Sequence, residues 1–197
     1  MRASHLDVDI AAELTRIQAR RVKHRSPGLH LSDCLKFIMT VLEPGKYGDG
    51  EINPLMVHQG FLWEDLLSEQ LGRQLGMRQT EVEQDGIFIT LDGFNTREWR
   101  TREAKATKIS AANPIRSSRF WKWHAQMMAG CRAMETRECE LVVLFINGSY
   151  ELGGGRFGEQ VGRAWVMEYT PREIEDNWRM VLRARDRMPR RCRFEKR

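Results

Sequence analysis

The stretch from Glu83 to Lys108 constrains the fold more than any other part of this sequence, because it predicts two strands joined by a short connection. Residues 85–92 are rich in Ile, Phe and Leu and include glycine near the start, with another glycine just after, which is typical of a strand that ends in a turn. A second strand leads into residues 102–107. Because alternate residues of a strand share a face, Glu103 and Lys105 should point the same way there. The stretch therefore predicts an acid and an amine held side by side.

This pair suits metal-assisted chemistry on phosphates. Mg²⁺ takes oxygen ligands, usually one or two carboxylates with waters and a substrate phosphate, and Asp85 and Glu103 are the candidate carboxylates. A bound metal activates water and stabilises charge on a phosphate oxygen, and Lys105 could position that water. The structural alternative is a surface ion pair between Glu103 and Lys105, with Asp85-Gly86 forming a turn.

Asp85, seventeen intervening residues and Glu103-Ala104-Lys105 resemble the D…ExK core of the PD-(D/E)XK nuclease superfamily. The resemblance implies a DNA nuclease that uses Mg²⁺, with Mn²⁺ as a substitute. Asp85 and Glu103 would ligate the metal, the carbonyl of Ala104 would be a further ligand, and Lys105 would orient the attacking water. Some relatives bind an iron–sulfur cluster through clustered cysteines. The four cysteines here, Cys34, Cys131, Cys139 and Cys192, are not clustered, so we expect reduced, mostly buried thiols and no such cluster.

Two helices flanking this motif strengthen the resemblance. In this superfamily a helix ahead of the first strand often carries another acidic ligand, and Glu64 lies within about 80° of three leucines on the apolar face of a predicted helix. A charge on that face needs a partner or a metal. The RecB-like and phage lambda exonuclease-like branches add a glutamine after the ExK strand, and Gln126 has that place. Their QxxxY pattern would require tyrosine where this chain has Gly130.

The predicted elements give an α/β fold with a mixed central sheet flanked by helices, the αβββαβ core of restriction-endonuclease-like proteins. Ser32 is the expected N-cap of a helix reaching Leu42. Residues 140–148 form a continuous apolar run that predicts a central buried strand, paired with 160–170. A capping box from Thr170 to Glu173 opens the last helix. We expect an N-terminal helical extension (1–29), a nuclease-like domain (30–187) and a basic tail (188–197).

Basic residues suggest where nucleic acid binds. The chain has a formal net charge of +5 and a pI near 9.2, and residues 183–197 carry eight basic side chains against two acidic ones, a local charge of +6. This tail is either a phosphate-contacting arm or an aid to solubility. Residues 116–123 mix basic and aromatic groups on which bases could stack, although such aromatic residues also serve as core. The candidate nucleic-acid contacts are Arg116, Arg119, Lys122, Arg190 and Arg191.

The sequence thus predicts a metal-dependent deoxyribonuclease, favoured as an exonuclease in phage or mobile-element recombination or DNA processing. An endonuclease on branched or specific DNA, a non-catalytic nucleic-acid-binding protein on a nuclease fold, and a small α/β interaction protein with an accidental motif stay open as alternatives. A homo-oligomer and a recombination or single-strand-annealing partner protein are also left open. No apolar run nears the roughly 20 residues needed to span a bilayer and no signal core opens the chain, so we expect no membrane association and a cytoplasmic protein, in the host cytoplasm if viral.

Overall fold

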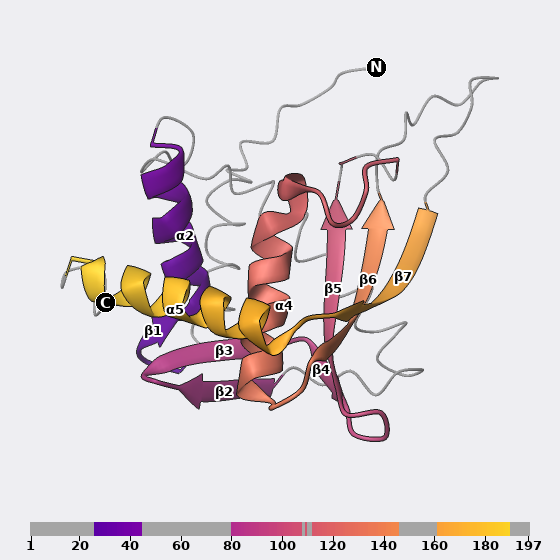
Figure 1. Cartoon of the computed structure of the whole chain (residues 1–197), viewed down its shortest axis with the longest axis horizontal. Coiled ribbons are helices and arrows are strands. Elements are labelled where there is room, and N and C mark those ends of the chain that lie inside the picture. Colours follow the sequence, from indigo (N-terminus) through magenta and orange to yellow (C-terminus); the bar gives the residue numbers. More distant parts are fainter. Residues whose placement is uncertain (1–25, 45–79, 108, 110–111, 146–160, 190–197) are drawn as a thin grey trace, which may run out of the picture.

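A computed structural model of the chain describes residues 26–44, 80–107, 109, 112–145 and 161–189 (Figure 1). In this part the chain alternates short strands with three α-helices and one 3₁₀ turn. The elements are β1 (Leu29–His30), α2 (Leu31–Leu42), β2 (Thr80–Gln84), β3 (Ile87–Leu91), β4 (Gly93–Asn95), β5 (Arg100–Thr107), η1 (Ser118–Phe120), α4 (Trp121–Ala133), β6 (Glu138–Phe145), β7 (Val161–Glu168) and α5 (Pro171–Arg187).

The strands form two mixed sheets, which confirms the predicted α/β fold with flanking helices. The first sheet has the order β1-β3-β2, with β1 parallel and β2 antiparallel to β3. The second has the order β4-β5-β6-β7, in which only the β5–β6 pair is parallel. The chain passes from one sheet to the other between Leu91 and Gly93. The single central sheet expected from the sequence is therefore divided at this point, and Asp92 lies at the division.

The β2–β3 hairpin follows from its two turn residues. Gln84 pairs with Ile87, so Asp85 and Gly86 alone connect the strands. Both have positive φ, 52° and 74°, as in the type I′ turn that suits the twist of two-residue hairpins. Asp and Gly are among the residues that reach this conformation at least cost. The Asp-Gly pair is thus sufficient to explain the sharp reversal of the chain here.

α4 is the crossover between the parallel strands β5 and β6, and it runs back alongside β5 (Figure 1). Gly130 brings the helix close to both sheets. A Cβ added there would lie 2.8 Å from Leu91 Cδ2 and 3.7 Å from Thr101 Cγ2. The helix therefore packs closely here, and any side chain at this position, including the tyrosine of the QxxxY pattern, would require the Leu91 side chain to shift.

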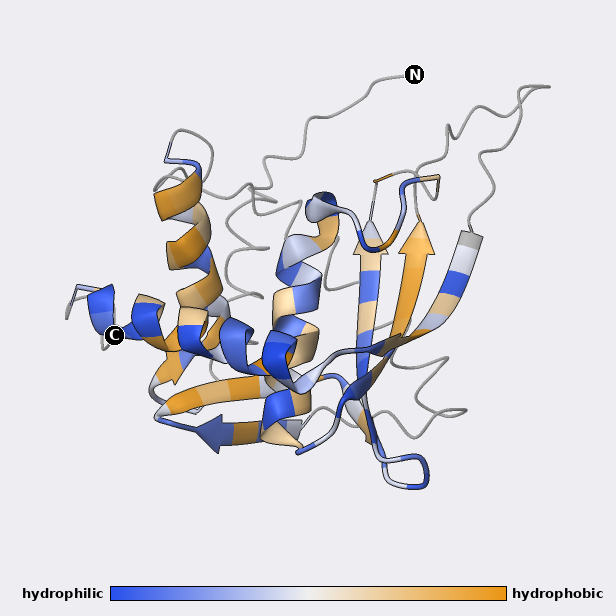
Figure 2. Cartoon of the chain, viewed as in Figure 1, coloured by the Kyte–Doolittle hydropathy of each residue, from blue (hydrophilic) through white to orange (hydrophobic). Residues whose placement is uncertain are grey.

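The core lies on both sides of α4. One cluster joins β1, α2, β3, α4 and α5, and a second joins α4, β6, β7 and the start of α5. In Figure 2 the hydrophobic residues accordingly gather on β3, β6 and α2. Alternate residues of β6 are fully buried and those between are half-buried, so the predicted continuously buried strand is buried mainly on one face. No helix in the described ranges is long and apolar enough to cross a membrane.

The helix ends follow local capping chemistry. Thr170 and Glu173 form the predicted capping box of α5, with Pro171 as the first helical residue. α2 differs slightly from its prediction. It begins at Leu31, with His30 rather than Ser32 at the N-cap, because Asp33 accepts a hydrogen bond from the His30 amide at 3.1 Å. The predicted pairing of the strand after residue 160 with β6 is confirmed by β7.

Candidate active site

Asp92, Glu103 and Lys105 come together at the junction of the two sheets. The antiparallel register pairs Gly93 with Arg102, so Asp92 comes beside Glu103. The Ala104 amide donates a hydrogen bond to Asp92 Oδ2 at 2.9 Å, which fixes this carboxylate against β5. Glu103 and Lys105 form an ion pair on one face of β5, as the alternation of strand residues predicts. Two carboxylates and an ammonium group therefore share one small region.

Asp85, which the sequence predicts as a metal ligand, lies apart from this group. It lies in the β2–β3 turn, whereas Asp92 follows the other end of β3, and the strand between them spans about 13 Å at 3.3 Å per residue. Asp85 Oδ2 accepts a hydrogen bond from Trp178 Nε1 at 2.8 Å, and its carbonyl accepts one from Arg185 at 2.7 Å. Asp85 thus fixes α5 to the hairpin.

Asp92 was missed because an Asp-Gly pair stands on each side of the same apolar strand, at Asp85 and at Asp92. The first pair makes the turn into β3, and the second stands where β3 ends. The hairpin that follows could have distinguished the two aspartates. Counting back from a turn near residues 96–99 places Asp92 beside Glu103, whereas it leaves Asp85 a full strand length away.

α4 covers the Glu103 face of β5. Thr101, on that face, contacts the helix through Cys131 (Oγ to Sγ, 3.7 Å) and Gly130. Residues four apart lie on the same side of a helix, so Gln126 and Lys122 follow Gly130 along the side that faces β5. Gln126 is half-buried. The structure therefore places the predicted glutamine on the helix face that covers Glu103.

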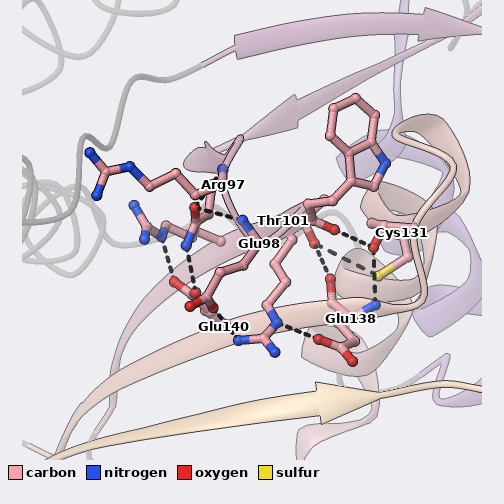
Figure 3. Close-up of polar contacts among 11 residues, drawn as sticks. Arg97, Glu98, Thr101, Cys131, Glu138 and Glu140 are labelled. Carbon is pink, nitrogen blue, oxygen red and sulfur yellow. Dashed lines mark hydrogen bonds and ion pairs between the residues drawn. The ribbon is translucent and has the colours of Figure 1, made fainter.

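The opposite face of β5 carries a separate set of ion pairs (Figure 3). Arg100 pairs with Glu98 and Glu138, and Arg102 pairs with Glu140. Asn95 Nδ2 also donates to Glu140 at 3.1 Å and so links β4 to β6. Arg102 faces Glu140, its register partner on β6, and Arg100 faces Glu138, the residue at the next position of the same register. These pairs oppose a one-residue slip, which would turn Glu103 and Lys105 away from α4.

The cysteines in the described residues, Cys34, Cys131 and Cys139, are buried thiols outside any disulfide. Burial beside Thr101 raises the pKa of Cys131 from 9.0 to about 11. In this pH range the folded protein holds a proton that the unfolded chain releases, so the free energy of unfolding should fall as pH rises from 9 to 11.

Cys131→Ala is therefore expected to flatten this pH dependence by roughly 2 to 3 kcal/mol over the interval. Urea unfolding of wild type and variant at pH 8, 9, 10 and 11 measures the difference. Parallel pH slopes would show that Cys131 ionises equally in both states.

The segment before α4 is held by His124. His124 Nε2 lies 2.9 Å from the Ile115 carbonyl, which can only accept, so this nitrogen carries the proton. Nδ1 lies 2.7 Å from the Tyr169 hydroxyl. Burial raises the pKa of Tyr169, which keeps its hydroxyl protonated. The loop that carries the predicted contact Arg116 is thus tied to α4 and to the residue that follows β7.

The other predicted nucleic-acid contacts are distributed unevenly. Arg116, Arg119 and Lys122 are all exposed near the start of α4, whereas Trp121 and Trp123 are half-buried against the core. The aromatic residues of this segment therefore contribute to packing. Trp121 also lines a pocket of about 440 Å³ between α4 and α5, on the opposite side of α4 from Gln126. Glu64, Arg190 and Arg191 lie outside the described residues.

The donor set fits a hard cation. Among the described residues, no group of three or more His, Cys, Asp or Glu side chains could hold a metal ion. Asp92 and Glu103 offer two carboxylates, and one oxygen of Asp92 is not used by the Ala104 amide. Mg²⁺ is commonly held by one or two carboxylates with waters and substrate phosphate, whereas structural zinc requires four protein ligands. The two carboxylates thus suit Mg²⁺ or Mn²⁺.

Comparison with known proteins shows the fold of this chain. No family model and no curated protein matches the sequence. SSO0001 is a solved structure with a TM-score of 0.55 and 10% identity, over 94% of this chain and 91% of its own. LHK-Exo in complex with dAMP has a TM-score of 0.50 and 14% identity, over 81% and 86%. A phage-related exonuclease from Haemophilus somnus 129PT matches with a TM-score of 0.46 and 12% identity, over 78% of each chain.

Proposed function

We propose that this chain is a metal-dependent nuclease that hydrolyses phosphodiester bonds in DNA, acting as an exonuclease. The observation that carries the proposal is the juxtaposition of Asp92 with Glu103 and Lys105 under α4. The likeness of the fold to LHK-Exo supports it. A role in phage or mobile-element DNA processing belongs to the same proposal.

Asp92 and Glu103 would hold Mg²⁺, which when bound activates water and stabilises negative charge on a phosphate oxygen. Lys105, kept in place by its ion pair with Glu103, would donate an N–H to the attacking water or to a phosphate oxygen. Gln126, from α4, can donate to the same water and accept from it. The Asp92–Ala104 hydrogen bond holds one carboxylate rigidly against the strand that carries the other.

The proposal is tested by incubating the wild-type protein with end-labelled linear duplex and with covalently closed circular DNA. Mg²⁺ or Mn²⁺ should permit progressive loss of the linear substrate, and a chelator should prevent it. Nicking of the closed circle would instead indicate an endonuclease. If neither substrate is cleaved at any metal concentration, although the protein is folded, the proposed function is wrong.

A further inference from the structure

A second lysine, Lys122, lies at the level of Lys105 on the helix that covers β5. A Cβ added to Gly130 would lie 3.7 Å from Thr101 Cγ2, and Cys131 Sγ lies 3.7 Å from Thr101 Oγ, so this end of α4 is aligned with Thr101. Lys122 is eight residues before Gly130, or about 12 Å back along α4. Lys105 is four residues after Thr101, or about 13 Å along β5 in the same direction. Because the helix runs against the strand, the two side chains are brought to the same end of the site.

At this end of the site, in the part of the chain that the structure describes, one lysine has an ion-pair partner and the other does not. Lys105 already uses Glu103 as its ion-pair partner, whereas Lys122 has no ion pair with any other described residue. Desolvation, and then repulsion from Lys105, lower the pKa of Lys122, although much of the residue remains exposed. Lys122 also stands in the first turn of α4, where the helix dipole disfavours a cation and which contains no acidic residue.

Holding two ammonium groups together in this way costs free energy unless an anion is present between them. Glu103 offsets the charge of Lys105 through its ion pair, and the glutamates that pair with Arg100 and Arg102 lie on the other face of β5. Among the described residues, the charge of Lys122 is therefore left without an ion-pair partner. A phosphodiester bound at Asp92 and Glu103 would meet both lysines, and each could donate a charge-assisted hydrogen bond to a non-bridging oxygen.

We propose that Lys122 is a second phosphate-binding lysine, which together with Lys105 holds the non-bridging oxygens of the DNA phosphate at the cleavage site. This inference rests on the proposed function. It predicts that Lys122 contributes to DNA binding in the absence of cleavage as well as to turnover. Because the ion pair with Glu103 holds Lys105, we expect Lys122 to be the lysine whose side chain changes position when the substrate binds.

The test compares two variants of Lys122 with a control. Lys122→Met keeps the aliphatic stem, and Lys122→Arg keeps the charge. Lys36→Met makes the same charge change at an exposed position of α2. Binding of a 5′-fluorescein-labelled duplex of about 20 base pairs is measured by anisotropy in Ca²⁺ across a salt series. Lys122→Met should weaken binding about tenfold or more and reduce the slope of log Kd against log salt by about one. Lys122→Arg should restore most of the affinity, and Lys36→Met should resemble wild type.

Turnover with Mg²⁺ on the same duplex separates the two proposals. If wild type cleaves DNA and Lys122→Met matches Lys36→Met in affinity, salt slope and kcat/KM, the role of Lys122 is overturned while the nuclease assignment stands. If wild type binds but does not cleave, the assignment fails, and the binding series alone decides whether Lys122 holds phosphate. Equal binding by all variants overturns the inference in either case.

Discussion

Asp92→Asn is expected to reduce metal-dependent DNA cleavage about a hundredfold or more, whereas Asp85→Asn should leave it within about twofold of wild type. The asparagine at position 92 keeps an oxygen for the Ala104 amide, so the local fold should survive. It removes the negative charge that a hard cation requires. Affinity for Mn²⁺, measured by calorimetry, should fall together with kcat.

Asp85→Asn is a matched control, because the substitution is chemically the same and the residue is also followed by glycine. Asparagine tolerates the positive φ of 52° at this position and still offers an oxygen to Trp178 Nε1. The free energy of unfolding in urea should therefore change by less than about 1 kcal/mol. If Asp85→Asn, rather than Asp92→Asn, loses metal affinity and activity, then Asp85 is the metal ligand and Asp92 is not.

The sequence predicted the local elements well because their signals are local. The alternation around Glu103 and Lys105, the capping box at Thr170 and the Pro171 start of α5 depend on neighbouring residues alone. The ion pair of Glu103 with Lys105 follows directly from that alternation. These features therefore needed no knowledge of the tertiary structure.

The choice between Asp85 and Asp92 depended instead on which end of β3 meets β5. That depends on the passage of the chain from one sheet to the other after Leu91, and Leu91-Asp92-Gly93 reads as an ordinary strand end. Gly130 is a similar case. As a departure from the QxxxY pattern it had no explanation in sequence, whereas the structure shows that α4 packs closely against Leu91, whose side chain would have to shift for a Cβ at this position.

The two faces of β5 carry different sets of side chains, because neighbouring residues of a strand point to opposite sides and contact different partners. Glu103 faces α4 with Lys105, whereas Arg102 faces away and pairs with Glu140. Only the first face carries the proposed metal ligands. The second carries ion pairs that hold the strands in register. Substitutions on the two faces should therefore differ in their effect on catalysis.

Glu103→Gln is accordingly expected to lower kcat about a hundredfold to a thousandfold at saturating metal and substrate, and to weaken its ion pair with Lys105 as well. The amide keeps the size of the side chain and a hydrogen-bond acceptor for Lys105, but it loses the charge that would hold the cation. Glu140→Gln should instead leave catalysis almost unchanged. It weakens a buried charged pair with Arg102, which should cost roughly 1.5 to 3 kcal/mol in urea unfolding, while kcat of the folded protein stays within about threefold of wild type. If both variants lose kcat to a similar extent, a disturbed β5 is sufficient to explain the inactivity. Glu103 would then act by maintaining the fold of the strand and not as a metal ligand.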